Sequence, residues 1–343
     1  MQLNDFDYQL PEELIAQKPI EPRNSSRLMV LNPRTKSIEH RKFFELEKFL
    51  RAGDTLIFND TRVIPARLIG RKSTGARVEI FLLRRIDLET WETLARPGKK
   101  LQIGSQVEFS EDLSCEILDR TEFGGRIVKF KFNGVFEEIL DRLGETPLPP
   151  YIHEKLEDRE RYQTVYSRID GSAAAPTAGL HFTREQMSEI ESRGINLGFL
   201  TLHVGLGTFR PVSEDRIEDH QMHSEFFTLP ESTANLIRET KSRGNRVIAV
   251  GTTSIRTLES VAKKFNGEIQ AMSGSTDIFI YPGFKFQVAD ALITNFHLPK
   301  STLLMLISAF AGREFVLEAY RIAVENRYRF FSFGDAMFIE ERI

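Results

Sequence analysis

The sequence predicts an α/β fold: a mixed, largely parallel sheet flanked by helices and interrupted by an inserted small antiparallel β-barrel. Strand-like and helix-like segments alternate with short loops at both ends of the chain, which is typical of a sheet covered by helices. Between them, six short segments of alternating hydrophobicity are separated by turn residues, as in a small barrel. The 343 residues, 41% hydrophobic and 28% charged, suffice for about two domains. We expect a discontinuous α/β catalytic domain (1–62 and 149–343) and a barrel domain (63–148).

The N-terminal elements are mixed. Residues 11–17 read as a short helix opened by proline, and residues 43–50 as an amphipathic helix that stops near Gly53. Two buried strands are expected at 27–31 and 54–58. The second strand leads into the polar residues 59–62, and the carboxyl end of a strand is where α/β folds place ligand groups. A plain turn is the alternative.

The barrel segments carry a basic excess. The six expected strands are 66–71, 77–83, 92–95, 106–109, 114–118 and 126–132. A small barrel with a basic face is a plausible platform for nucleic acid, although a solvated strand face is the commoner explanation of such charges. A helix at 134–143 and a stiff proline-rich connection at 144–150 lead back to the α/β domain.

The C-terminal half alternates again. Helices are expected at 184–193, 231–242, from 254 to about 264, 301–311 and 314–326. Strands are expected at 195–204, 246–250, 276–281, 291–294 and 337–339.

A run of small residues at 171–183 precedes the first of these helices. Small side chains let backbone amides approach a ligand closely. Thr183 and Gln186 form a capping box, which places His181 just before a helix N-terminus, a position that suits an anionic group. An ordinary surface loop is the alternative.

Four polar segments follow expected strands, at 59–62, 203–210, 251–256 and 294–300. In an open α/β sheet such ends converge on one crevice, so a ligand site is expected there. The pair Gly205 and Gly207 gives only weak support for a dinucleotide site, because no third glycine follows and Pro211 interrupts the position of the helix. The segment 251–254 is placed to hold a carboxylate or phosphate, but it lacks the lysine of a P-loop.

The sequence gives less support for metal-dependent hydrolysis or for acyl transfer. His220 and His223 are spaced like metal ligands, but no H-E-x-x-H motif accompanies them and Cys115 is the only cysteine. A metal-dependent hydrolase therefore stays an unsupported alternative, and no G-x-S-x-G motif points to acyl transfer. We expect metal-free acid–base chemistry with no permanently bound cofactor.

Composition and local sequence indicate the compartment. The net charge is −3, the apolar segment 301–311 is too short to span a bilayer, and the first residues lack the pattern of a signal peptide. We expect a cytoplasmic protein with no membrane contact and no obligate protein partner.

Several long motifs resemble one family. They are Arg161-Tyr-Gln-Thr-Val-Tyr166 and the segments 171–183, 201–212, 250–259, 293–300 and 328–337. In order along the chain they are similar to the S-adenosylmethionine:tRNA ribosyltransferase-isomerases of the queuosine pathway. The resemblance implies an α/β domain interrupted by a barrel. It also implies transfer and isomerisation of the ribosyl part of S-adenosylmethionine onto 7-aminomethyl-7-deazaguanine at the tRNA wobble position. Epoxyqueuosine-tRNA forms, and adenine and methionine leave. A non-catalytic tRNA-binding protein is the remaining alternative.

The resemblance also suggests roles for residues. Because an ordinary histidine titrates near neutral pH, we expect His181 and His203 to be the acid–base pair, with His297 in reserve. The expected contacts to S-adenosylmethionine are Pro176, Thr177, Gly179, Gly205, Gly207, Thr208, Arg210, Thr252, Thr253, Ser254, Arg256 and Asn295. The expected contacts to tRNA are Arg62, Arg67, Arg84, Arg96, Tyr162 and Lys300.

Overall fold

The structure is a computed structural model that describes all residues except 122–123, 155, 206–211 and 213. Its contacts divide the chain into two compact units. The α/β unit comprises residues 1–61, 150–169 and 175–343, and the barrel unit comprises residues 62–149 and 170–174. The domain boundaries expected above stay a prediction, since they concern which parts fold independently.

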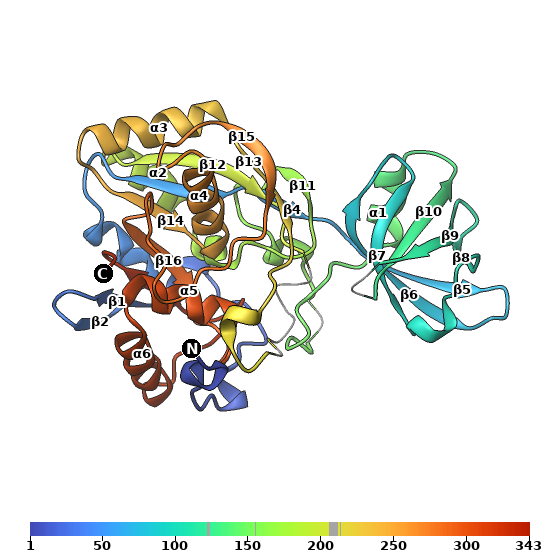
Figure 1. The fold of residues 1–343 in the computed structure, drawn as a ribbon, viewed down its shortest axis with the longest axis horizontal. Coiled ribbons are helices and arrows are strands. Elements are labelled where there is room, and N and C mark those ends of the chain that lie inside the picture. Colours follow the sequence, from blue (N-terminus) through green and yellow to red (C-terminus); the bar gives the residue numbers. More distant parts are fainter. Residues whose placement is uncertain (122–123, 155, 206–211, 213) are drawn as a thin grey trace. The chain divides into compact units, whose positions relative to one another are not determined.

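One mixed sheet forms the centre of the α/β unit (Figure 1). Among the described residues it has nine strands in the order β15-β13-β12-β3-β14-β16-β17-β1-β2. Their bounds are β1 Arg27–Asn32, β2 Ser37–Lys42, β3 Thr55–Asn59, β12 Asn196–Leu202, β13 Glu225–Leu229, β14 Val247–Val250, β15 Met272–Thr276, β16 Ala291–Asn295 and β17 Ala336–Ile339. The neighbours β12, β3, β14 and β16 pair in parallel, whereas β15, β13 and β2 join through antiparallel pairs. The predicted fold class, a mixed α/β sheet with an inserted barrel, is confirmed.

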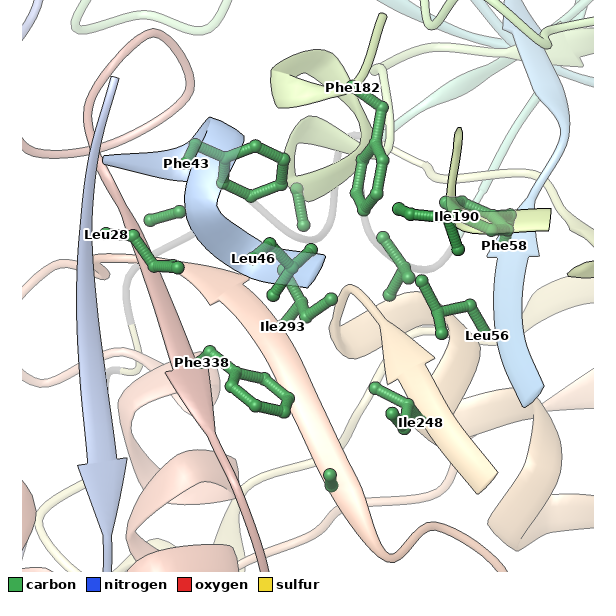
Figure 2. Close-up of a cluster of buried hydrophobic side chains, with 14 of the residues drawn as sticks. Leu28, Phe43, Leu46, Leu56, Phe58, Phe182, Ile190, Ile248, Ile293 and Phe338 are labelled. Atoms are coloured by element: carbon green, nitrogen blue, oxygen red, sulfur yellow. The ribbon is translucent and has the colours of Figure 1, made fainter. Parts of the chain in front are cut away.

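The central strands are apolar on both faces because both faces are covered. Every residue of β3, β14 and β16 is buried, as expected for parallel strands between layers of helices. Figure 2 shows one covered face, where Leu56, Ile248 and Ile293 pack with Phe43 and Ile190 from outside the sheet.

The other face packs against a helix that requires a glycine in the sheet. A Cβ on Gly198 of β12 would lie 2.8 Å from Cδ1 of Ile57 and 3.2 Å from Cγ2 of Thr233. Thr233 belongs to helix α3, so the missing side chain allows this helix to approach the sheet closely.

The helices match the expected positions. Their bounds are α2 Arg184–Ser192, α3 Glu231–Ser242, α4 Thr252–Lys264, α5 Thr302–Ala311 and α6 Arg313–Glu325. The expected α-helix at 43–50 is the 3₁₀ helix η4, Phe43–Phe49. Phe43, Leu46 and Phe49 all pack into the core, and a spacing of three places side chains on one side of a 3₁₀ helix. The expected helix at 11–17 likewise contains only the 3₁₀ turn η2, Glu12–Leu14.

The strand prediction at 276–281 is wrong. Strand β15 ends at Thr276, and Ile278 and Ile280 are buried without belonging to a ladder. Alternating hydrophobicity reports that one side of the chain is buried, not that its backbone is paired. The Thr276 hydroxyl accepts the Ile278 N–H at 3.2 Å, which ends the strand locally. Strands β2 and β13 were not predicted.

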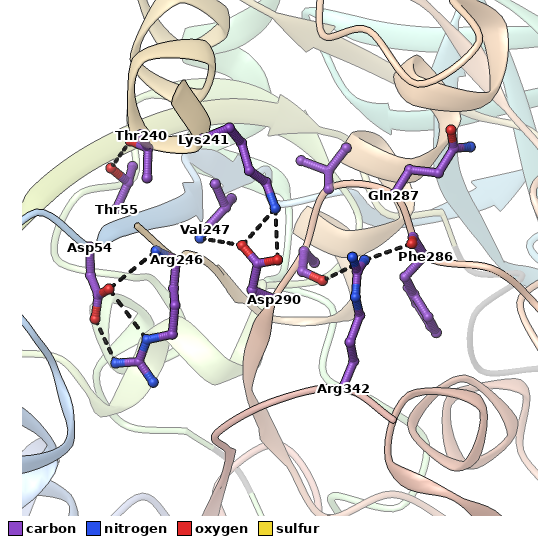
Figure 3. Close-up of polar contacts among 12 residues, drawn as sticks. Asp54, Thr55, Thr240, Lys241, Arg246, Val247, Phe286, Gln287, Asp290 and Arg342 are labelled. Atoms are coloured by element: carbon purple, nitrogen blue, oxygen red, sulfur yellow. Dashed lines mark hydrogen bonds and ion pairs between the residues drawn. The ribbon is translucent and has the colours of Figure 1, made fainter. Parts of the chain in front are cut away.

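Paired charges stabilise the amino-terminal edge of the sheet (Figure 3). Asp54, before β3, forms a 2.6 Å ion pair with Arg246, before β14. Asp290, before β16, accepts from Lys241 at 2.6 Å and from the Val247 N–H at 2.8 Å. These charges satisfy one another and join the starts of three parallel strands.

The barrel unit is a closed barrel of six strands among the described residues, in the order β10-β7-β6-β5-β8-β9. Their bounds are β5 Arg67–Lys72, β6 Arg77–Arg85, β7 Thr90–Arg96, β8 Gln106–Ser110, β9 Leu113–Arg120 and β10 Arg126–Phe132. Helix α1, Phe136–Leu143, follows them, and its Phe136 ring packs against Trp91 and Phe130. Arg126 is buried and donates to the carbonyls of residues 98, 101, 124 and 125, so its charge closes two loops of the barrel.

Candidate active site

Four parallel strands bring their carboxyl ends to one edge of the sheet. Strands β12, β3, β14 and β16 are consecutive neighbours and run in the same direction. The described residues that directly follow these strands, such as Asp60, His203 and Gly251, therefore lie at this edge, opposite the ion pairs of Figure 3. The predicted convergence of these strand ends is confirmed, and it defines the candidate site.

Asn59 and Asp60 hold the ends of β3 and β12 together. The Asn59 amide donates to the Leu202 carbonyl and accepts from the Leu202 N–H, both at 2.9 Å. The buried Asp60 carboxylate accepts from the Thr201 hydroxyl and from Nε of Arg168, both at 2.6 Å. The segment 59–62 is thus more than a plain turn, because its side chains continue the ladder after the strand ends.

His203 lies at the same edge, directly after β12. Its Nδ1 atom is 2.8 Å from the Thr61 hydroxyl oxygen, which lies 3.5 Å from the Ile169 carbonyl. The contact with Thr61 orients the imidazole ring at the strand edge. The ring is stacked on Phe226 at a centroid distance of 6.4 Å. His203 is half-buried, so its environment suits proton transfer better than a closed core would.

His181 is buried and lines a small cavity together with Arg23 and Phe333. Its Nδ1 lies 2.8 Å from the Ser26 hydroxyl and its Nε2 lies 3.0 Å from Nδ2 of Asn295. The ring stacks on Phe43 at 5.0 Å. Burial, reinforced by the charges of Arg329 and Arg23, lowers the pKa of His181 to about 3. The side chain is therefore neutral at physiological pH, with Nε2 as the acceptor.

His297 is also buried and neutral. Its Nε2 atom lies 2.9 Å from the Thr294 hydroxyl, and its backbone N–H donates to the Tyr320 hydroxyl at 2.9 Å. Burial lowers the pKa of His297 to about 3. Among the three predicted catalytic histidines, His203 is the one that is only half-buried.

Within the small-residue segment 171–183, residues Thr177–His181 form the 3₁₀ helix η7, with Pro176 at its start. It lies against the end of β14, since a Cβ on Gly251 would be 3.7 Å from Cβ of Ala178. A Cβ on Gly179 would lie 1.9 Å from the Tyr166 hydroxyl. Gly179 therefore makes room for a tyrosine of the protein itself, which is a packing role that the sequence did not indicate.

The start of α4 carries polar groups that the described protein leaves unpaired. Gly251, with φ of +89°, makes the turn from β14 into the helix. Ser254 donates to the Val250 carbonyl and Thr252 is buried. The Thr253 hydroxyl oxygen is buried without a hydrogen-bond partner among the described residues. The buried Oδ1 of Asn295 likewise finds no partner there.

Arg256 forms a buried ion pair with Glu225, the first residue of β13. The other oxygen of Glu225 accepts the Gly205 N–H at 2.9 Å, so this carboxylate joins the loop after β12 to helix α4. Nε and Nη2 of Arg256 are buried and have no partner within the described part of the chain. Donors of this kind bind carboxylates and hydroxyl oxygens. Glu225 was not among the site residues predicted from the sequence. A buried arginine requires an acidic partner, so Arg256 was the signal that such a residue exists.

The residues predicted to contact tRNA are mostly paired within the protein. Arg67 pairs with Glu79 at 2.7 Å, Arg84 with Glu92 at 3.1 Å, Arg62 with Asp170 at 3.9 Å and Lys300 with Asp7 at 3.0 Å. Arg96 is exposed at the end of β7.

One predicted tRNA contact is buried, and three predicted ligand residues lie outside the described part of the chain. Tyr162 is fully buried against Phe333, so in this arrangement its ring does not face a base. The predicted ligand residues Gly207, Thr208 and Arg210 lie outside the described residues. These contacts stay predictions.

Two features are absent from the described residues: a helix able to cross a membrane, and a group of side chains able to hold a metal ion. No helix among them combines the length and the apolar character that crossing a bilayer requires. No group of three or more His, Cys, Asp or Glu side chains in this part of the chain is arranged to hold a metal ion.

The similarity to known proteins extends over nearly the whole chain. The sequence model of the queuosine biosynthesis protein family matches residues 3–339. The chain belongs to this family. It is also similar to a crystal structure of S-adenosylmethionine tRNA ribosyltransferase from Thermotoga maritima, with 44% identity over 98% of this chain and 99% of that chain and a TM-score of 0.57. The resemblance drawn from the sequence motifs is confirmed at the level of the family.

Proposed function

We propose that the protein transfers and isomerises the ribosyl moiety of S-adenosylmethionine onto 7-aminomethyl-7-deazaguanine at the tRNA wobble position. The product is epoxyqueuosine-tRNA, and adenine and methionine leave. The observation that carries the proposal is the 44% identity to a tRNA ribosyltransferase over nearly the full length of both chains. We expect the enzyme to act in the cytoplasm, without a resident metal or cofactor.

The chemistry requires a base and an acid at defined positions. The positive sulfur of S-adenosylmethionine acidifies the neighbouring C5′ protons, so a base can start the rearrangement. Protonation of an adenine ring nitrogen makes adenine a better leaving group. Histidine suits both tasks near neutral pH. We assign the proton-transfer role to His203, whose Nδ1 is held by Thr61 at the strand edge.

The buried histidines suit a different role. His181 is neutral and bonded through both ring nitrogens, to Ser26 and Asn295. We propose that it positions Asn295, whose buried Oδ1 has no partner among the described residues. His297 supports the same strand end through Thr294. A direct proton transfer by His181 would require these contacts to open first.

The start of α4 suits the anionic end of the substrate. The Gly251 N–H donates to the Ile293 carbonyl at 2.8 Å, so the amides of residues 252–254 and the unpaired donors of Arg256 are the groups that offer hydrogen bonds to the methionine carboxylate and the ribose hydroxyls. Glu225 holds Arg256 in place through its buried ion pair. Gly205, whose N–H donates to Glu225, is a further proposed contact, as are Pro176 and Thr177 of η7. The proposed contacts Gly207, Thr208 and Arg210 lie outside the described residues.

The tRNA supplies phosphates and an unstacked base. Lysine and arginine side chains suit the phosphates, and the barrel arginines Arg62, Arg67, Arg84 and Arg96 together with Lys300 are the proposed contacts. Those with carboxylate partners would exchange them for phosphates on binding, which predicts a salt-dependent affinity.

Release of adenine tests the function directly. The protein is incubated with S-adenosylmethionine labelled in its adenine ring and with tRNA that carries the aminomethyl base. Free labelled adenine should appear in step with a mass increase of the tRNA, and tRNA with ordinary guanine at the wobble position should release none. Binding of the modified tRNA without adenine release would instead indicate a non-catalytic tRNA-binding protein.

A further inference from the structure

The barrel unit carries a second candidate site, a pocket at the seam between β5 and β8. Its cavity volume is about 550 Å³, and its walls include Gly70, Arg71, Arg77, Glu108, Phe109 and Ser114. The seam is loosely paired, because only Arg71 with Glu108 and Lys72 with Val107 are in register there. Residues 69–70 and 109–110, next to these register pairs, line the pocket. Its volume is in the range of small-molecule sites.

The Phe109 ring lines this pocket and also packs against the buried Phe130 ring, at a centroid distance of 6.0 Å. The register of β8 against β9 shifts between Glu108 and Ser110, so Phe109 is the extra residue of a bulge. Bulges redirect a side chain and interrupt pairing. A Cβ on Gly70 would lie 2.8 Å from Cδ1 of Phe109, so the ring packs over bare backbone. The ring remains half-buried, which leaves part of it facing the pocket.

Two arginines at opposite positions of β5 and β6 line the pocket, and Arg71 also donates to the Gly75 carbonyl at 3.1 Å. Arg71 and Arg77 are directly opposite in the β5–β6 register, where like charges destabilise the pair. Within the described chain neither has a carboxylate within ion-pair distance, whereas Arg67, Arg84 and Arg85 on the same two strands each have one. Lys72 of β5 also lacks a carboxylate partner there and donates to the Lys100 carbonyl. The two arginines of these strands without such a partner are therefore the two that line the pocket. An anion bound between the two guanidinium groups would remove the repulsion.

We propose that this pocket binds one unstacked nucleotide of RNA. The backbone phosphate lies between Arg71 and Arg77, and the base stacks on Phe109. The rim carboxylates of Glu108 and Glu111 can only accept hydrogen bonds, so they favour a base edge that presents amino groups. The inference rests on the proposed function in one respect, namely that the RNA is the tRNA substrate.

Binding of fluorescein-labelled RNA to the full-length chain tests the pocket. The probes are a tRNA anticodon stem–loop, a single-stranded 12-mer and a blunt RNA duplex, each titrated at several salt concentrations. R71Q/R77Q should weaken stem–loop binding about tenfold or more and reduce the salt slope by about one. F109L should weaken stem–loop and single-strand binding about fivefold or more, leave duplex binding unchanged and leave the salt slope unchanged, while F109Y binds like wild type.

The matched control removes two positive charges elsewhere on the barrel unit. In K129Q/R142Q both charges are already paired, with Glu89 and Asp112, so stem–loop affinity should change less than threefold. Circular dichroism and urea unfolding of every variant establish that the barrel is folded. A loss in R71Q/R77Q no larger than in the control, or wild-type binding by F109L, would overturn the proposal.

Adenine release by the wild-type chain separates this inference from the proposed function. If the chain releases adenine and the pocket variants bind RNA like wild type, the pocket assignment fails and the function stands. If the pocket variants lose RNA binding while the wild-type chain releases no adenine, the function fails and the pocket stands.

Discussion

Nε2 of His181 accepts a hydrogen bond from Nδ2 of Asn295 at 3.0 Å, across 114 residues of sequence. The same Asn295 amide donates to the Phe331 carbonyl at 3.2 Å, which fixes its orientation. This contact joins the small-residue segment to the end of β16 and requires an unprotonated Nε2. His181, the histidine of the small-residue segment, therefore has a structural role: it connects two parts of the site.

Acidification should destabilise the fold through its buried histidines. Burial lowers the pKa of His181 and His297 to about 3, well below the ordinary value of 6.5. Between these values the unfolded chain binds more protons, so the stability present above pH 6.5 is lost as the pH falls. Each histidine contributes a slope of up to about 1.4 kcal/mol per pH unit. Urea unfolding between pH 5 and 8 measures this slope, which H181N and H297N should each reduce; an unchanged slope in both would contradict the assignment.

Gly179 offers a test of packing against ligand contact. G179A places a Cβ where the Tyr166 hydroxyl lies, and overpacking of this kind costs about 1–3 kcal/mol of unfolding free energy. Y166F in the same chain removes the clashing oxygen and should restore part of the loss. Chemical denaturation of the two single variants and the double variant measures this coupling. If G179A keeps wild-type stability but raises the KM for S-adenosylmethionine, Gly179 contacts substrate instead.

Proton transfer by His203 predicts graded losses of activity. H203A should lower the rate of adenine release by about 10²–10⁴-fold, the usual contribution of a general acid or base. T61V removes the hydroxyl that holds Nδ1 and should give a smaller loss, largely in kcat, which T61S restores. Single-turnover assays at saturating S-adenosylmethionine give these rates. Binding of tRNA by H203A should stay at the wild-type level, and near-normal turnover in H203A would exclude His203 from the chemistry.

Removing one partner of the Arg256–Glu225 ion pair should lower the free energy of unfolding strongly, whereas replacing both partners by apolar residues should lower it little. R256M leaves the Glu225 carboxylate buried without its partner, which costs about 3–5 kcal/mol of unfolding free energy. The double variant R256M/E225L removes both charges and should recover most of this loss. Its affinity for S-adenosylmethionine should nevertheless stay low, because the unpaired donors of Arg256 are gone. Recovery of both stability and affinity in the double variant would argue against a substrate role.

Local patterns predicted most of the fold for physical reasons. Buried runs such as 247–250 read as strands because parallel strands are covered on both faces. The six barrel strands were located because turn residues interrupt their alternation. Strand β13, Glu225–Leu229, was missed because it follows a polar segment and its pairing partners β12 and β15 are distant in sequence. Strand pairing is a long-range property, which no local pattern contains.

The sequence by itself determined the family, the fold class and the edge of the sheet where the site lies. Long motifs specify a family, and parallel strands necessarily place their carboxyl ends together. Only the tertiary structure decided what each side chain at that edge does. It separated His203, half-buried beside Thr61, from His181, whose two nitrogens are both engaged. The reason is physical: the pKa and partners of a histidine depend on burial and on contacts more than a hundred residues away.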